Sequence, residues 1–206
     1  MPQDRYYWGM DSVHPAPELG LAQIVEEYRV TANIGTLVDR VRALAARTDP
    51  EQLAQATRPF ASMPEVIIPA YEHILAARPE DAQAMVVLAN AYWLTGRGPE
   101  VVGALARRAK EADAENRGAW HLWALSEPNL RTRVDRWREV TRRFPQDQLA
   151  RAALADNAVS LASGEDDPAA LDLAIVTYES LLAEATRPEQ RSALQGAIDA
   201  LKRGTR

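Results

Sequence analysis

The sequence contains no cysteine and few histidines, and these two absences exclude several kinds of chemistry. Without cysteine the chain forms no disulfide, holds no thiolate-ligated zinc or iron–sulfur cluster, and offers no thiol nucleophile. Its three histidines are each separated by more than forty residues, so no single helix places two of them on one face. We therefore predict no metal site and no cofactor.

Long hydrophobic runs and catalytic motifs are also missing. No stretch approaches the roughly 18 uninterrupted apolar residues of a membrane span, and the N-terminal residues lack the basic start and apolar run of a signal peptide. The patterns G-x-G-x-x-G, G-K-[ST], H-E-x-x-H and G-x-S-x-G do not occur. We expect a cytoplasmic, non-catalytic protein that does not enter a membrane.

Alanine dominates the composition, with 37 of the 206 residues, whereas aromatic residues make up only 6%. Alanine has the lowest free-energy cost in a helix, and sheets favour β-branched and aromatic residues. Apolar residues recur at three- and four-residue spacing in short segments separated by turn residues. One segment starts after Asp167, a predicted N-cap, with Pro168 in the first helical position. We predict an all-α fold of about ten helices, each of about 10 to 16 residues.

The predicted helices recur in pairs at a nearly constant interval. Alignment of the segments places Pro79, Ala114 and Pro145 at equivalent turns, with spacings of 35 and 31 residues. Helix pairs that recur every ~34 residues are typical of the tetratricopeptide repeat (TPR).

Residues 82–116 resemble one TPR unit most closely. The matching residues are Met85, Leu88, Ala89, Asn90, Ala91 and Tyr92 in the first helix, Gly96 at the turn and Ala109 in the second helix. A further unit follows with Trp120, Trp123, Ala124, Trp137 and Pro145. The resemblance covers residues 35–185 and implies an α-solenoid of antiparallel helix hairpins, a TPR-like superhelix.

The two ends of the chain and one proline depart from a regular repeat. Residues 1–34 are predicted to form an N-terminal arm plus a first helix, and residues 35–206 a TPR-like domain with a C-terminal capping helix. The aromatic cluster around Trp8 either caps the first helices or docks on a partner. Pro69 falls inside a predicted second helix, which it should kink or restart.

The resemblance also implies which residues bind a partner. In this family, peptide ligands lie along the concave face made by the first helices of the units. The matching positions in this chain are Gln83, Val86, Asn90, Trp93, His121, Leu125 and Asp156. The family's clamp for C-terminal carboxylates needs a lysine and an asparagine where this chain has Val86 and Leu122. We therefore expect a mixed polar and aromatic groove for a protein segment.

The charged residues are unevenly distributed along the chain. The net charge is −5, yet residues 104–145 carry ten basic and six acidic side chains. Arg131, Arg138 and Arg142 in this basic middle are candidates for a surface that binds an acidic partner. The negative total charge and the lack of exposed aromatic residues between the arginines disfavour nucleic acid as a partner.

These observations lead to three functional hypotheses. We favour a non-catalytic scaffold or adaptor that binds a protein segment in the concave face of the repeats. The alternative is a self-assembly module, in which the basic middle of one copy pairs with the acidic ends of another to form a homo-oligomer. A less favoured third hypothesis is a helical-bundle enzyme that uses His121, Glu127 or Asp156 near a pocket.

Overall fold

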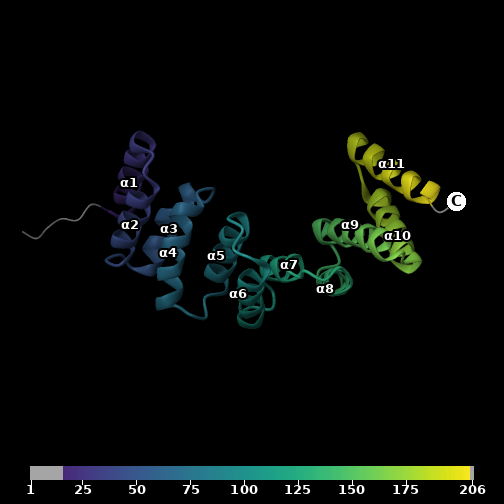
Figure 1. The fold of residues 1–206 in the computed structure, drawn as a ribbon, viewed down its shortest axis with the longest axis horizontal. Helices are drawn as coiled ribbons and strands as arrows, with labels where there is room; N and C mark the ends of the chain where they lie inside the picture. The colour runs from purple at the N-terminus through teal and green to yellow at the C-terminus, as the bar shows by residue number, and fades with distance from the viewer. Residues whose placement is uncertain (1–15, 205–206) are drawn as a thin grey trace, which may run out of the picture. The chain divides into compact units, whose positions relative to one another are not determined.

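The structure is a computed structural model that describes residues 16–204 (Figure 1). These residues form eleven α helices and one short 3-10 helix, and no strand occurs among them. The chain divides into two compact units, of which unit 1 ends at Arg78 and unit 2 begins at Pro79. The all-α fold of sequential helix hairpins that the sequence predicts is confirmed.

Unit 1 contains two hairpins, in which α1 (Pro17–Thr31) pairs with α2 (Ile34–Ala45) and α3 (Pro50–Thr57) pairs with α4 (Pro64–Ala77). The 3-10 turn Arg58–Phe60 joins α3 to α4. Because α1 also packs on α3 and α2 on α4, the first helices form one layer and the second helices another. The core of the unit includes seven fully buried side chains: Leu21, Val25, Leu37, Val41, Leu53, Val66 and Ile74.

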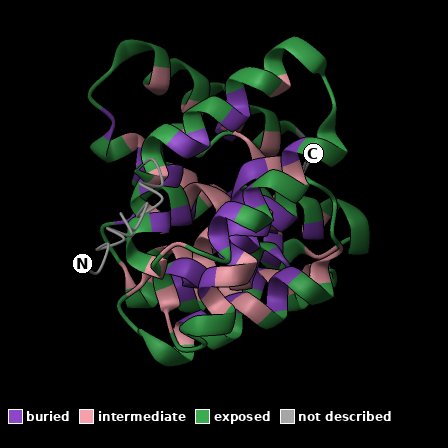
Figure 2. Cartoon of the chain, turned by 90° about the vertical axis from the view of Figure 1, so that its left-hand side faces the viewer, coloured by how far each residue is buried: buried purple, intermediate pink, exposed green. Residues whose placement is uncertain are grey.

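Unit 2 contains three hairpins and one terminal helix. Its helices are α5 (Ala82–Leu94), α6 (Pro99–Ala112), α7 (Arg117–Leu125), α8 (Leu130–Arg143), α9 (Gln148–Glu165), α10 (Pro168–Glu184) and α11 (Pro188–Gly204). Successive helices pack on each other, and α5 also contacts α7. Figure 2, seen from the side of α1 and α2 in Figure 1, shows that single helices of the described chain carry both buried and exposed residues.

Local capping explains where the helices of unit 2 begin. Five N-cap side chains accept a hydrogen bond from the backbone N–H three residues further on: Asp81, Asn116, Asn129, Asp147 and Asp167. Each such cap contributes about 1 kcal/mol to helix stability. Pro168 occupies the first position of α10 after Asp167, as predicted.

Two elements of unit 1 add detail to the prediction. From the sequence, Thr48-Asp49-Pro50 is expected to end the helix that contains Leu37, Val41 and Leu44. In the structure the same segment also starts α3, with Asp49 as the N-cap and Pro50 as the first residue. This helix has only eight residues, which is too short for a clear apolar stripe. In addition, α4 continues through Pro69 to Ala77, so the proline does not restart the helix, and the alternative of a kink at this position stays a prediction.

The proposed domain boundary after residue 34 falls just inside α2, which begins at Ile34, and both α1 and α2 belong to unit 1. The aromatic cluster around Trp8 and His14 lies outside the described residues. The division into an arm of residues 1–34 and a repeat domain of residues 35–206 therefore stays a prediction.

Three tryptophans form the centre of the core of unit 2. Trp120 and Trp137 are buried, and Trp123 packs against the same cluster. The rings of Trp120 and Trp123 meet edge to face, with centroids 5.7 Å apart. The Lys110 ammonium lies 4.2 Å from the Trp120 centroid and 3.6 Å from the Trp123 centroid, with Glu139 at 4.0 Å. The ammonium group of Lys110 on α6 thus forms cation–π contacts with the rings of Trp120 and Trp123 on α7.

We expect Lys110→Met to lower the free energy of unfolding by about 1 kcal/mol, because methionine keeps the apolar stem and removes the cation. Chemical denaturation of the full chain measures the change. The matched control is Lys202→Met, which removes the other lysine from an exposed ion pair with Glu179 and should change stability by less than about 0.5 kcal/mol. The effect of Lys110→Met should shrink in a Trp123→Leu background, and equal effects in both backgrounds would contradict the cation–ring contact.

Candidate partner-binding face

Four residues predicted to bind a partner follow one face of α5: Gln83, Val86, Asn90 and Trp93. Their spacings of three, four and three residues place them on successive turns of the same side. Gln83 and Asn90 are exposed, Val86 is partly buried, and Trp93 is 39% exposed. The amide of Asn116, which caps α7, donates to Oε1 of Gln83 over 3.5 Å. This side of α5 therefore borders α7 and remains open to solvent farther along the helix.

The helices α5 and α7 approach each other closely at their N-terminal ends. A Cβ atom at Gly118 would lie only 3.0 Å from Cγ1 of Val86, so a larger residue here would need the Val86 side chain to shift by a few tenths of an ångström. Both are first helices of hairpins, and the contacts at their N-terminal ends join residues 32 and 33 positions apart, Val86 with Gly118 and Gln83 with Asn116. Leu125, the last residue of α7, comes 32 positions after Trp93 and is 37% exposed. We name these residues the α5–α7 face: Gln83, Val86, Asn90, Trp93 and Leu125.

His121, another predicted partner-binding residue, is engaged within the chain. Its Nε2 lies 2.7 Å from Oδ2 of Asp147, and its ring meets that of Trp137 edge to face at 5.3 Å. Nε of Arg117 lies 3.6 Å from the same carboxylate oxygen. Because the Asp147 side chain is only 3% exposed, these groups join the α7/α8 hairpin to the start of α9. A partner-binding role of His121 stays a prediction.

The carboxylate of Asp147 has a second function as the N-cap of α9. Its Oδ1 accepts hydrogen bonds from the backbone N–H groups of Leu149 at 3.0 Å and Ala150 at 3.2 Å. Burial by itself raises the pKa of this carboxyl group. The hydrogen bonds from Ala150 and His121 and the nearby positive charges outweigh burial, so the pKa of Asp147 lies below its ordinary range. The ionised form is therefore stabilised in the folded protein.

Asp147 is a residue that the motif search misses. The repeat carries a signal for it, because Asp81 and Asp147 both lie two residues after a proline, at Pro79 and Pro145. That signal predicts an N-cap at both positions. The contact with His121 depends instead on how the α7/α8 hairpin packs on α9, which no local pattern reveals.

Asp156, the last of the predicted groove residues, is bound within its own hairpin. The hydroxyl of Tyr178 in α10 donates a hydrogen bond to Oδ1 of Asp156. Burial, together with this hydrogen bond to a carboxylate, raises the pKa of Tyr178. Asp156 lies on α9 and is not part of the α5–α7 face. Its role toward a partner stays a prediction.

The three arginines predicted to bind an acidic partner have different surroundings. Arg131 donates to Glu165 at 2.6 Å and to Asp167 at 2.9 Å, and so connects α8 to the turn between α9 and α10. Arg138 is paired within α8. Arg142 is exposed and forms no ion pair among residues 16–204. Carboxylates of this chain thus pair with both Arg131 and Arg138, whose side chains are 54% and 43% exposed, and of the three arginines only Arg142 is without an ion pair among the described residues.

The residues of the enzyme hypothesis do not form one cluster. His121, Glu127 and Asp156 are each bound to a different partner within unit 2. No group of three or more histidine, aspartate or glutamate side chains that could hold a metal ion is found in the described part of the chain. No helix between residues 16 and 204 combines the length and the apolar character needed to cross a membrane.

Solved structures share this arrangement of hairpins over most of the chain. A crystal structure of the MamA protein superposes with a TM-score of 0.58 at 12% sequence identity, covering 85% of this chain and 100% of that one. The structure of TTC0263, a thermophilic TPR protein in Thermus thermophilus, superposes with a TM-score of 0.54 at 17% identity, covering 89% and 99%. The chain has a TPR-like fold.

The resemblance to tetratricopeptide repeats is thereby confirmed at the level of the fold. No protein-family model and no curated protein matches the sequence. TPR-like folds are typically protein–protein interaction scaffolds, because stacked hairpins create an extended binding surface.

We expect Asp147→Asn to lower the free energy of unfolding by about 1–2 kcal/mol near neutral pH, because asparagine keeps a capping oxygen but loses the charge facing His121 and Arg117. Since the pKa of Asp147 is lowered in the folded state, its contribution is complete above the ordinary pKa of about 3.9 and disappears as the pH falls through the folded value. The variant should therefore lose less stability than the parent between about pH 5 and pH 2.

Chemical denaturation at several pH values measures this difference. Asp81→Asn is the matched control, because Asp81 caps α5 in the same way and forms no ion pair among the described residues. It should change stability by less than about 0.5 kcal/mol. Equal losses and identical pH profiles for the two variants would show that Asp147 acts only as a cap.

Proposed function

We propose that this protein is a non-catalytic scaffold that binds a segment of a partner protein along the α5–α7 face. The observation that carries the proposal is that Trp93 and Leu125, at the C-terminal ends of two first helices that contact each other, both stay more than one-third exposed. Large apolar side chains that remain exposed at neighbouring positions are typical of interaction sites. Asn90 lies one turn before Trp93 and adds a polar group to the same side of α5.

The two kinds of side chain have complementary roles in this proposal. The Asn90 amide carries both a donor and an acceptor, so it can pair with the backbone C=O and N–H of an extended segment. Trp93 and Leu125 offer apolar area to a side chain of that segment, and tryptophan is enriched among residues that dominate binding energies. Asn90 would orient the segment, and the apolar pair would supply most of the affinity.

The absence of charge on the α5–α7 face specifies the segment further. None of its five residues is ionisable, and Arg117 and His121 nearby are already bound to Asp147. Leu122, at the position where the family's carboxylate clamp requires asparagine, is buried. A charged segment would lose hydration on this face without gaining a partner charge. We therefore expect an uncharged segment with a large apolar side chain, and not an acidic C-terminal tail.

The self-assembly alternative depends on basic residues that are free to meet another copy. Several of them are paired within one chain, as Arg131 is with Glu165 and Asp167, and Arg136 with Glu127. Fewer cations then remain for a second copy, which favours the scaffold hypothesis. Charge-driven association would weaken as salt increases, so sedimentation at low and high ionic strength separates the two hypotheses.

Selection of peptides on the full chain tests the proposal. Peptides enriched from a random display library would be synthesised and titrated against the protein. We expect uncharged sequences with one large apolar residue. The Asn90→Ala/Trp93→Ala double variant should raise their Kd by at least about thirtyfold, which corresponds to the loss of about 2 kcal/mol at dominant contacts. Because Trp93 is only 39% exposed, the double variant should also unfold at a lower temperature than the parent, so circular dichroism at the titration temperature must show that it is folded.

The matched control is Val176→Ala on α10, which truncates an apolar side chain that is 63% exposed and distant in sequence from the face. It should leave the Kd of the selected peptides unchanged. Two results would contradict the proposal: full binding by the double variant, or enrichment of acidic peptides whose binding requires Arg138 and Arg142.

A further inference from the structure

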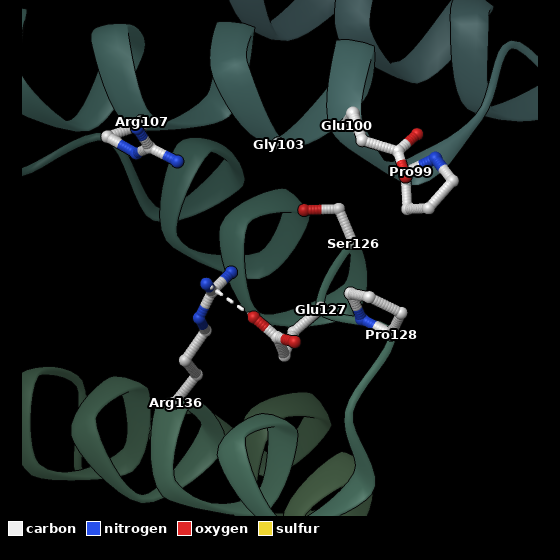
Figure 3. Close-up of a pocket in the computed structure, with 8 residues that line it drawn as sticks. All are labelled: Pro99, Glu100, Gly103, Arg107, Ser126, Glu127, Pro128 and Arg136. Atoms are coloured by element: carbon white, nitrogen blue, oxygen red, sulfur yellow. Dashed lines mark ion pairs between the residues drawn. The ribbon is translucent and has the colours of Figure 1, made fainter.

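A pocket of about 150 Å³ lies in unit 2 between α6 and the turn that joins α7 to α8 (Figure 3). One wall is formed by α6, with Glu100, Gly103 and Arg107 on consecutive turns of one side. The opposite wall comes from the α7–α8 turn and the facing side of α8. No residue of α5 lines this pocket, so it is separate from the α5–α7 face.

In the opposite wall, Arg136 and Glu127 form an ion pair with each other. Nη2 of Arg136 lies 2.5 Å from Oε2 of Glu127, and Nη1 of Arg136 donates to the backbone oxygen of Trp123 at 2.8 Å. The second carboxylate oxygen of Glu127 accepts from the backbone N–H of Asn129 at 3.0 Å. Both side chains are therefore held in place, and their charges compensate each other. This pair forms a polar wall with no net charge.

The α6 wall carries two charges without partners in the described chain. Arg107 and Glu100 are exposed, and neither forms an ion pair or a side-chain hydrogen bond with any residue from 16 to 204. They are seven residues apart, which separates their Cα atoms by about 10 Å along the helix. Figure 3 shows Arg107 at one end of this wall and Glu100 at the other. The pocket thus has one positive and one negative end.

A buried hydroxyl lies between these two charges. Ser126 is only 3% exposed, and its Oγ contacts the backbone oxygen of Trp123 over a long 3.4 Å. A Cβ atom at Gly103 would lie 3.0 Å from this Oγ, so glycine at position 103 lets the hydroxyl reach the α6 wall. Figure 3 shows the hydroxyl directed into the space between the arginine and glutamate side chains.

We propose that this pocket binds a small zwitterion of the amino-acid or dipeptide type. Its carboxylate would lie at the Arg107 end, within reach of the Ser126 hydroxyl, and its ammonium group at the Glu100 end. The charges lining the pocket sum to zero, which matches a ligand that is neutral overall but has separated charges. A phosphate would meet the carboxylates of Glu100 and Glu127, and a simple cation would meet Arg107 and Arg136.

Calorimetric titration of the full chain tests this proposal with defined compounds. The zwitterions tested are glycylglycine and 6-aminohexanoate. They are chosen because their two charges are several bonds apart, as the two charged ends of the pocket require. Acetate, butylammonium and inorganic phosphate are the singly charged or anionic comparators. We expect saturable binding of at least one zwitterion with a Kd in the millimolar range or below, and binding at least about tenfold weaker for every comparator.

Variants that remove one charge at a time measure what each end of the pocket contributes to binding of the zwitterion. Arg107→Gln and Glu100→Gln should each raise the Kd of the zwitterion by about tenfold, because each removes one of the two charge contacts. Arg142→Gln is the matched control, since Arg142 is another exposed and unpaired arginine of unit 2, and it should leave the Kd unchanged. The Asn90→Ala/Trp93→Ala variant should also bind the zwitterion normally, because its substitutions lie outside the pocket.

Three results would overturn the proposal. The first is the absence of saturable binding by both zwitterions. The second is phosphate or acetate binding as tightly as the zwitterions, which would indicate an anion site. The third is unchanged zwitterion binding in either Arg107→Gln or Glu100→Gln, with melting temperatures that show both variants are folded.

Discussion

Close approach between helices is the constraint on which the arrangement of unit 2 depends. Fully buried alanines occupy the interfaces of α5, α6 and α7, and Gly118 allows α7 to lie against Val86. Small side chains at a contact shorten the distance between helix axes. A larger residue at position 118 would crowd Cγ1 of Val86, which lies 3.0 Å from the position of an added Cβ atom. Glycine at this position therefore suits the close packing of α7 beside the candidate binding face.

The two candidate surfaces of unit 2 use different physical chemistry. The α5–α7 face is uncharged and offers apolar area beside one amide, which suits a segment of another protein. The pocket between α6 and the α7–α8 turn offers separated charges around a buried hydroxyl, which suits a small polar molecule. A charged ligand and an apolar segment would therefore not compete for the same site. The stacked hairpins supply both surfaces, because each junction between hairpins exposes a different set of side chains.

Ion pairs within the chain explain why fewer arginines of the basic middle can bind a partner than their number in the sequence predicts. Arg131 reaches carboxylates more than thirty residues later, at the turn between α9 and α10. Asp147 brings Arg117 and His121 to the start of α9. These contacts cross from one hairpin to the next, so they stabilise the stacking of hairpins. The same contacts remove groups from the surface that residue counts alone would assign to a partner.

Helix positions, the repeat period and the placement of Gln83, Val86, Asn90 and Trp93 on one side of a helix could be predicted from the sequence, because caps and spacing act within a few residues. The short helix α3 is not predicted because Asp49 and Pro50, which start it, also follow the end of α2 and in the sequence indicate only the end of that helix. The partners of His121, Asp156 and Arg131 lie 22 to 36 residues away in the chain. Only the packing of hairpins selects those partners, because side-chain electrostatics depends on distances in space that local spacing does not set.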